Sequence, residues 1–223
     1  MARSLGLVLD LAFAGFVSVT DVEGNPIVRH GRPPGARYDD IAEWIEGALT
    51  EVEGNFSDLA WICVGIGPGS FTGIRIAMAF AQGLAMPREV PLHGFTSFVP
   101  LLLSTPEREM GDTSSEAPQL AILPANTGLF YAASHLEDPG ALLSAEEVRG
   151  LASSQTVLKV PALTASLDPI LPYFHHTHAV EEGWNVPAVV THARTFKKTF
   201  KRDALHPYYL QLSAAEAKLS DSV

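Results

Sequence analysis

The sequence predicts a mixed α/β fold arranged in two lobes, and three observations support this prediction. Short strand patterns open the chain at 5–10, 16–20 and 27–29 and are separated by turns. A helical pattern follows at 41–52, and then a strand, a glycine-rich turn and a second helix occupy 59–86. Beyond residue 118 a strand–turn–strand pattern starts again, which is a hint of duplicated architecture.

The composition is that of a globular chain and excludes several classes of protein. Of 223 residues, 47% are hydrophobic and 18% are charged, with a formal net charge of −10, which argues against disorder and against nucleic-acid binding over the whole surface. Asp10 interrupts the first apolar run, so we expect no cleaved signal peptide, and no later run reaches the roughly 20 apolar residues of a membrane span. The single cysteine, Cys63, lies in an apolar strand and is expected to be a buried, inert thiol, which suits a reducing cytoplasm.

The first lobe begins with strands that we expect to form an antiparallel meander. The clearest helix follows, with Asp39 or Asp40 as its predicted N-cap and acidic residues on its second face. A core-facing helix with a solvated acidic face is the favoured interpretation, and a partner interface is the alternative. The apolar stripe of this helix consists of Ile41, Trp44, Ile45, Ala48, Leu49 and Val52.

The glycine-rich turn 67–73 lies between the strand of 59–66 and the helix of 74–86. Gly67, Gly69 and Gly73 permit a close approach of another group to the backbone, and Ser70 and Thr72 can cap the helix. Such a loop can bind an anion at the helix N-terminus, or it can simply pack the strand against the helix. It is not a Walker A loop, because no lysine follows the last glycine, and its spacing does not match the dinucleotide fingerprint.

The helix after this turn contains a row of small residues, and further elements follow it. Gly73, Ala77, Ala81 and Ala85 recur every four residues, which allows a second helix to approach closely, either within the chain or from another protein. A short strand at 90–94 and a helix ending at Leu103 complete the first half. The polar stretch 104–118 predicts a linker between a first lobe of 1–103 and a second lobe of 119–223. The final helix of the second lobe could fold back and pack on the first lobe.

The second half is predicted less completely. Strands are expected at 119–123, 129–133 and 157–160, and 161–187 is expected to be rich in loops. His175, His176 and His178 lack a familiar ligand spacing, so a surface loop is favoured over a metal site. A helix at 188–203 carries a basic cluster that is either a solvated face or a contact for RNA or an acidic partner. The cluster consists of Arg194, Lys197, Lys198, Lys201 and Arg202.

Three segments together resemble the signature of the bacterial TsaB proteins, also called YeaZ, which belong to tRNA threonylcarbamoyladenosine biosynthesis. These segments are 67–76, 81–85 and 94–98, and 126–131 and 206–210 support them. The resemblance implies an actin-like ATPase fold (ASKHA, ribonuclease H-like) with two lobes built on βββαβα-type cores, the second lobe being reduced. The predicted order of elements in the first lobe agrees with that fold.

The resemblance also implies a non-catalytic role. TsaB proteins pair with the related TsaD, which performs the chemistry, and act with the ATPase TsaE, so tRNA is reached through the complex. The product is threonylcarbamoyl adenosine beside the anticodon of tRNAs that read codons beginning with A. The partner interface would come from the first-lobe helices. Its expected residues are Ile41, Trp44, Ile45, Ala48, Gly73, Ile74, Ala77, Met78 and Ala81.

The phosphate loop of the actin-like fold is expected to be degenerate in this chain. Its residues would be Asp10, Gly67, Gly69, Ser70, Thr72 and Gly73. Leu11-Ala12-Phe13 follows Asp10 where relatives keep hydroxyl groups, Pro124-Ala125-Asn126 replaces a common Asp-Ala-Arg, and Gln211 replaces a usual arginine. We therefore expect no cofactor, no metal and no catalytic residue, with ATP binding by the isolated chain doubtful. The alternatives are a sugar-kinase-like or peptidase-like enzyme, and a homodimeric regulatory protein that uses the same helix face.

Overall fold

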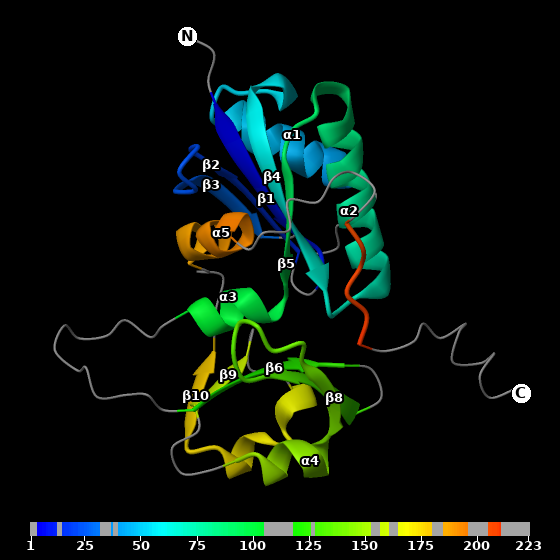
Figure 1. Ribbon diagram of the computed structural model, residues 1–223, viewed down its shortest axis with the longest axis vertical. Coiled ribbons are helices and arrows are strands. Elements are labelled where there is room, and N and C mark those ends of the chain that lie inside the picture. Colours follow the sequence, from blue (N-terminus) through cyan, green and yellow to red (C-terminus); the bar gives the residue numbers. More distant parts are fainter. Residues whose placement is uncertain are drawn as a thin grey trace, which may run out of the picture. The chain divides into compact units, whose positions relative to one another are not determined.

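The computed structural model describes residues 4–12, 15–31, 37, 40–104, 118–125, 128–152, 157–160, 165–179, 185–195 and 205–210, and gives only the backbone of 157–160, 178 and 179. The chain divides into two compact units (Figure 1). The first comprises Met1–Ser97 with Val186–Tyr209, and the second comprises Phe98–Asn185 with Leu210–Val223. Within the described residues, no helix has the length and apolar character that crossing a bilayer requires.

The first unit is built on a sheet of five strands in the order β3-β2-β1-β4-β5. The meander of β1, β2 and β3 is antiparallel, as the sequence predicts, and β4 and β5 continue the sheet parallel to β1. Parallel neighbours require crossover connections, and helices supply them here. The strands are β1 (Leu5–Asp10), β2 (Phe16–Thr20), β3 (Pro26–Gly31), β4 (Leu59–Gly67) and β5 (Leu92–Thr96).

Two helices cover one face of this sheet, and their apolar sides form a single core with it. They are α1 (Ile41–Glu51) and α2 (Phe71–Ala85). The core-facing interpretation of α1 is confirmed, because its apolar stripe is buried apart from the half-buried Trp44, while Glu43 and Glu46 are exposed. Asp40 occupies the N-cap position but makes no capping hydrogen bond through its side chain. Short 3₁₀ helices at Phe56–Asp58 and Met86–Arg88 flank β4 and α2.

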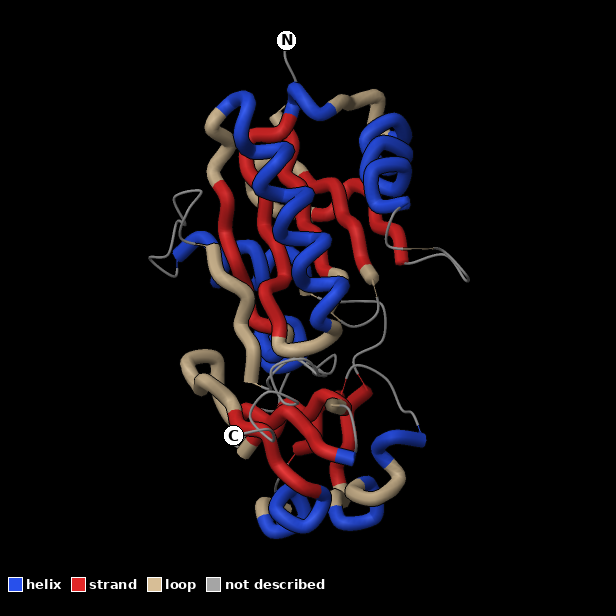
Figure 2. The backbone as a smooth tube through the Cα atoms, turned by 90° about the vertical axis from the view of Figure 1, so that its right-hand side faces the viewer, coloured by secondary structure: helices blue, strands red, loops and turns tan. Residues whose placement is uncertain are grey.

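The other face of the first sheet is covered by α5 (Val186–Thr195), which contacts β5. Trp61 and Cys63 point to this face, because side chains alternate along β4 and Ile62 and Val64 belong to the α1–α2 core. Figure 2 shows helices on both sides of the strands. The last described helix therefore belongs to the first unit, although the chain reaches it only after the second.

The second unit repeats the strand order of the first. Its sheet runs β10-β9-β6-β7-β8, in which β6, β7 and β8 form an antiparallel meander and β9 and β10 are parallel to β6. This confirms the hint of duplicated architecture. The strands are β6 (Gln119–Pro124), β7 (Leu129–Ala133), β8 (Ala141–Ser144), β9 (Val157–Val160) and β10 (His176–Ala179).

The helices of the second unit are shorter than those of the first. They are α3 (Phe98–Leu103) and α4 (Ala145–Gly150). Two 3₁₀ turns, Ala165–Leu167 and Leu171–Tyr173, stand between β9 and β10, where the first unit has the 15-residue α2. The second lobe is thus the reduced one.

Several predictions differ from the structure. The boundary between units falls at Ser97, so α3 belongs to the second unit and not to a first lobe of 1–103. The histidine cluster is not a loop, because His176 and His178 lie on β10. Short β8 and α4 were not predicted at all. Predictions that fall on Phe13, Asp39, 105–117, Asn126, Thr127, Lys197, Lys198, Lys201, Arg202 and Gln211 lie outside the described residues.

Candidate functional site

The glycine-rich turn joins β4 to α2 at the carboxyl edge of the first sheet. Gly67 and Gly69 adopt φ values of +104° and +153°, and a Cβ on Gly67 would lie 2.7 Å from the carbonyl oxygen of Tyr208. Residues that carry a side chain rarely adopt such φ values, so this backbone conformation requires glycine at both positions. Ser70 is the N-cap of α2 and its Oγ accepts a hydrogen bond from the backbone N–H of Gly73 at 3.2 Å. Thr72 is exposed in the first turn of the helix.

The chain's own backbone occupies the N-terminal end of α2. The N–H of Ser70 donates to the carbonyl oxygen of Ala12 at 2.7 Å. Gly73 lies so close to the turn after β1 that a Cβ would stand 2.0 Å from the carbonyl oxygen of Leu11. An anion cradle needs free N–H groups and open space at this end of the helix. The turn after β1 takes up the Ser70 N–H and the space beside Gly73, which favours the structural interpretation of the glycine turn.

Asp10 is sealed beneath the same turn. Its side chain is 2% exposed, and its Oδ1 accepts a hydrogen bond from the backbone N–H of Ala12 at 2.9 Å. A Cβ on Gly65 would lie 2.3 Å from that oxygen, so the carboxyl group is enclosed by backbone. Burial raises the pKa of Asp10 from 3.8 to about 6, against the opposing effect of the Ala12 hydrogen bond. The described residues contain no group of three His, Cys, Asp or Glu side chains placed to hold a metal ion.

The predicted interface residues are almost all in the core, and the prediction needs correction. Trp44 is half-buried, and the other eight side chains are buried in the first unit. The row of small residues on α2 permits the helix to pack closely on β4 and β1, so its neighbour is internal. The buried eight are Ile41, Ile45, Ala48, Gly73, Ile74, Ala77, Met78 and Ala81.

The opposite side of α2 is unusually apolar for a solvent-facing surface. Its only charged residue is Arg75 among 15 residues. Ala79 and Gly83 are exposed, and a Cβ on Gly83 would meet nothing within 4 Å. Three large apolar side chains beside them are only partly buried. We call this surface the α2 outer face, and it consists of Ile76, Ala79, Phe80, Gly83 and Leu84.

Two features of the α2 outer face favour a protein partner. A helix that is apolar on all sides is ordinarily buried on all sides. Exposed small residues let a second helix approach the backbone, and the larger apolar groups beside them supply area to bury. Met86, just beyond the end of α2, is a further large apolar side chain that is 50% accessible. The acidic exposed side of α1 offers no comparable area.

An aromatic cluster fixes the C-terminal segment to the start of α2. The rings of Phe71 and Tyr209 stack with centroids 4.8 Å apart, and the Arg75 guanidinium lies 3.7 Å from the Phe71 centroid. Arg75 Nε donates to the Tyr209 hydroxyl at 3.0 Å, and the Tyr208 N–H donates to the carbonyl of Ile66 at 2.8 Å. Sequence analysis missed this arrangement, because its members are far apart in the chain.

The described part of the basic cluster has a structural role. Arg194 Nη1 donates to the carbonyl oxygen of Val22 at 2.9 Å, and its guanidinium lies 5.5 Å from the Trp61 ring centroid. Cys63 is buried, as the sequence predicts, and burial raises the pKa of its thiol to about 12, so the thiol stays protonated at neutral pH. Burial, and secondarily the charge of Arg194, lowers the pKa of His93, whose Nδ1 has no hydrogen-bond partner among the described residues.

Two lobes that share one strand order, with a glycine turn after the fourth strand of the first, define an actin-like ATPase fold. Comparisons with known proteins agree. The family model of TsaD, tRNA N6-adenosine threonylcarbamoyltransferase, matches residues 38–155. The chain belongs to this family, and the curated relatives to which it is similar carry the TsaB name.

Two curated relatives carry the TsaB name. The chain is 30% identical over 117 residues to the "tRNA threonylcarbamoyladenosine biosynthesis protein TsaB" of Escherichia coli (strain K12), which covers 52% of this chain and 48% of that protein. It is 33% identical over 57 residues to the protein of the same name from Buchnera aphidicola subsp. Schizaphis graminum (strain Sg), covering 26% of this chain and 27% of the relative. The matched region thus spans about half the length of these curated relatives, or less.

Two solved structures from Pseudomonas aeruginosa share the fold. One is an uncharacterized protein with similarity to peptidase YEAZ, with a TM-score of 0.71 at 21% identity, covering 94% of this chain and 100% of that chain. The other is YeaZ, with a TM-score of 0.71 at 20% identity, covering 92% and 99%. At these identities the likeness shows the fold alone.

Proposed function

We propose that this chain is a non-catalytic subunit of the cytoplasmic machinery that makes threonylcarbamoyladenosine in tRNA, and that it binds and stabilises TsaD. Family membership and the names of the relatives support the pathway. The α2 outer face supports the role within it, because it is an apolar surface that a partner protein would cover.

The filled phosphate loop supports the absence of catalysis. A phosphotransferase of the actin-like class must direct backbone N–H groups and a carboxylate toward the phosphates and their metal ion. In this chain Ser70 donates to Ala12, and Asp10 is enclosed by backbone. Chemistry on tRNA would then belong to TsaD, with TsaE as a further partner and tRNA reached through the complex.

The α2 outer face is the observation that supports a role within a complex. A protein that worked alone would gain nothing from a solvent-facing helix with one charged residue. The same face would serve a homodimer when TsaD is absent, and this is the second candidate. The two pairings compete for one surface, so TsaD would dissociate the homodimer.

The test is a pull-down of the tagged chain from its native cytoplasm together with measurement of the modification. We expect TsaD to co-purify, and we expect deletion of the gene to reduce threonylcarbamoyladenosine in tRNAs that read codons beginning with A. If no TsaD is recovered and the modification is unchanged, the proposed function is wrong. The mass of the purified chain in solution, measured with and without TsaD, decides between homodimer and heterodimer.

A further inference from the structure

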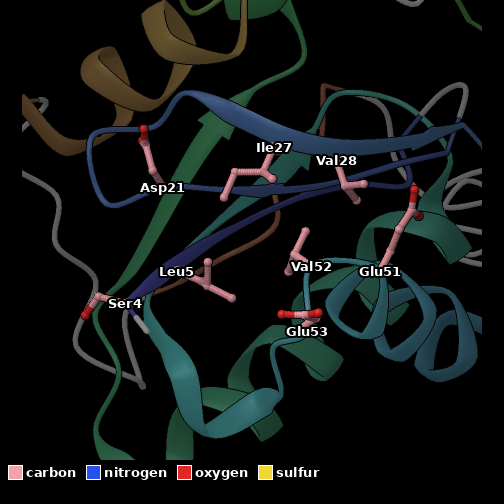
Figure 3. A pocket seen from close by; sticks show the side chains of 8 residues that line it. All are labelled: Ser4, Leu5, Asp21, Ile27, Val28, Glu51, Val52 and Glu53. Carbon is pink, nitrogen blue, oxygen red and sulfur yellow. The ribbon is translucent and has the colours of Figure 1, made fainter. Parts of the chain in front are cut away.

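A groove opens on the first unit beyond the C-terminal end of α1. Its volume is about 530 Å³, and it lies between the start of β1, the turn after β2, strand β3 and the residues that follow α1. Figure 3 shows its side chains from these elements. None of them belongs to the α2 outer face. The lining residues are Ser4, Leu5, Asp21, Ile27, Val28, Glu51, Val52 and Glu53.

The groove combines apolar side chains with acidic ones. Leu5 and Val52 are buried and Val28 is half-buried, whereas Ile27 is 54% exposed on an otherwise polar strand. Glu51 and Glu53 stand on the α1 side, and Asp21 stands on the opposite side (Figure 3). An apolar surface with an acidic rim is complementary to a lysine or arginine, whose aliphatic stem covers the apolar part while its charge meets the carboxylates.

The end of α1 adds to the negative potential of this groove. The C-terminus of a helix carries partial negative charge, which basic residues in the last turn normally offset. The last turn of α1 has no basic residue and ends in Glu51, with Glu53 two positions beyond. His30 Nε2 and Glu51 Oε2 lie 2.8 Å apart at this end of the helix, and both side chains are exposed. The Asn25 side chain donates a hydrogen bond to the Asp21 carboxylate, and nearby backbone N–H groups donate others. These hydrogen bonds lower the pKa of Asp21 and keep it ionised.

Strand β3 forms the outer edge of the sheet beside the groove. Sheet order places it last, and its residues are exposed apart from Val28. An open edge strand presents backbone donors and acceptors that an extended peptide can pair with. Pro26 restricts such pairing at the start of the strand, so a peptide would pair with the part from Ile27 onward. An extended ligand on this edge would direct alternate side chains toward the groove.

We propose that this groove, with the edge of β3, binds an extended segment of a partner protein in which a lysine or arginine alternates with apolar residues. The surface is distinct from the α2 outer face, and the proposal does not depend on the proposed function. A chain bound at both surfaces would connect two partners.

The experiment uses the full chain and a fluorescent peptide of about eight residues that alternates lysine with valine, titrated by anisotropy at low salt. We expect saturable binding, with NMR amide shifts at Leu5, Ile27 and Glu53. The double variant Glu51→Lys/Glu53→Lys is expected to weaken binding about tenfold, because attraction becomes repulsion at two exposed positions. Ile27→Thr, which keeps a strand-forming residue, is expected to weaken it several-fold by removing apolar contact.

The matched control is Glu43→Lys/Glu46→Lys, which makes the same change of charge on exposed positions of α1 outside the groove. It is expected to bind the peptide almost as the wild type does. Equal weakening by both double variants would show unspecific attraction to an acidic chain and would overturn the proposal. So would an absence of binding, or equal binding of a peptide with glutamate in place of lysine. Self-association of the chain that Ile27→Thr abolishes would assign the groove to a second copy and contradict the partner assignment.

Discussion

The backbone N–H of Ser70 donates a 2.7 Å hydrogen bond to the carbonyl oxygen of Ala12, joining the N-cap of α2 to the turn after β1. In an anion-binding loop, that end of the helix faces a ligand. Here two elements of the same lobe meet at it, and Asp10 is closed beneath them. We infer that the glycine turn serves to position α2, whose outer face is the proposed partner surface.

The contact between Gly73 and Leu11 predicts a large effect from a single methyl group. A Cβ at Gly73 would stand 2.0 Å from a carbonyl oxygen of the turn, and backbone on both sides limits relaxation. Gly73→Ala is therefore expected to lower the free energy of unfolding by about 3 kcal/mol. Gly83→Ala, on the same helix with open space, is expected to raise it by about 0.5 to 1 kcal/mol. Urea denaturation of both variants checks this, and equal stability of Gly73→Ala and wild type would contradict the packing described.

Burial of Asp10 predicts a stability that depends on pH. The raised pKa means that the folded chain binds this proton more tightly than the unfolded chain, so ionisation disfavours folding. The contribution is fully present below pH 3.8 and is lost as the pH rises through about 6, a difference of about 3 kcal/mol. Asp10→Asn cannot ionise and is expected to flatten the dependence between about pH 4 and about pH 7, measured by urea denaturation. Parallel curves for variant and wild type would show that Asp10 is not its source.

The two sides of α2 predict opposite outcomes for one substitution. Ala77 is fully buried, so Ala77→Arg places an unpaired charge in the core and is expected to unfold the chain or cost more than about 4 kcal/mol. Ala79 is exposed, so Ala79→Arg is expected to change stability by less than about 0.5 kcal/mol. Thermal unfolding followed by circular dichroism distinguishes them. A stable Ala77→Arg would mean that the row of small residues does not face the core.

The filled loop predicts the behaviour of the isolated chain with nucleotide. Calorimetric titration with Mg-ATP is expected to give no saturable heat, because the Ser70 N–H and the Asp10 carboxyl group already make hydrogen bonds within the chain. Tight binding with turnover would instead favour the enzyme alternative, in which this lobe acts on a nucleotide.

Much of the first lobe could be predicted from the sequence, because its strands and helices have strong periodicity and clear turns. The sequence pattern could not predict whether the row of small residues from Gly73 to Ala81 faces the core or the solvent. α2 has apolar residues on both sides, among them Ile74 within the core and Ile76 outside it, so periodicity does not show which side is buried. Only the exposure of these residues in the folded chain shows which side of α2 faces the core.

The second lobe was harder to predict for a different reason. Strand β10 contains His176 and His178, and its stability comes from parallel pairing with β9 rather than from its own propensity. The helix α5 packs on β5 of the first lobe, and no local sequence pattern indicates this long-range contact. The contact of Arg194 with Trp61 follows from that placement. Tertiary context determined each of these features.

The affinity of the purified chain for TsaD, with arginine introduced at two exposed alanines, tests the central claim most directly. Ala79 lies on the α2 outer face, and Ala141 is an exposed alanine on β8 of the second unit, so Ala141→Arg is the matched control. We predict that Ala79→Arg weakens binding at least about a hundredfold while the variant stays folded, and that Ala141→Arg leaves it unchanged. Unaltered affinity of folded Ala79→Arg would contradict the assignment of the α2 outer face as the partner interface.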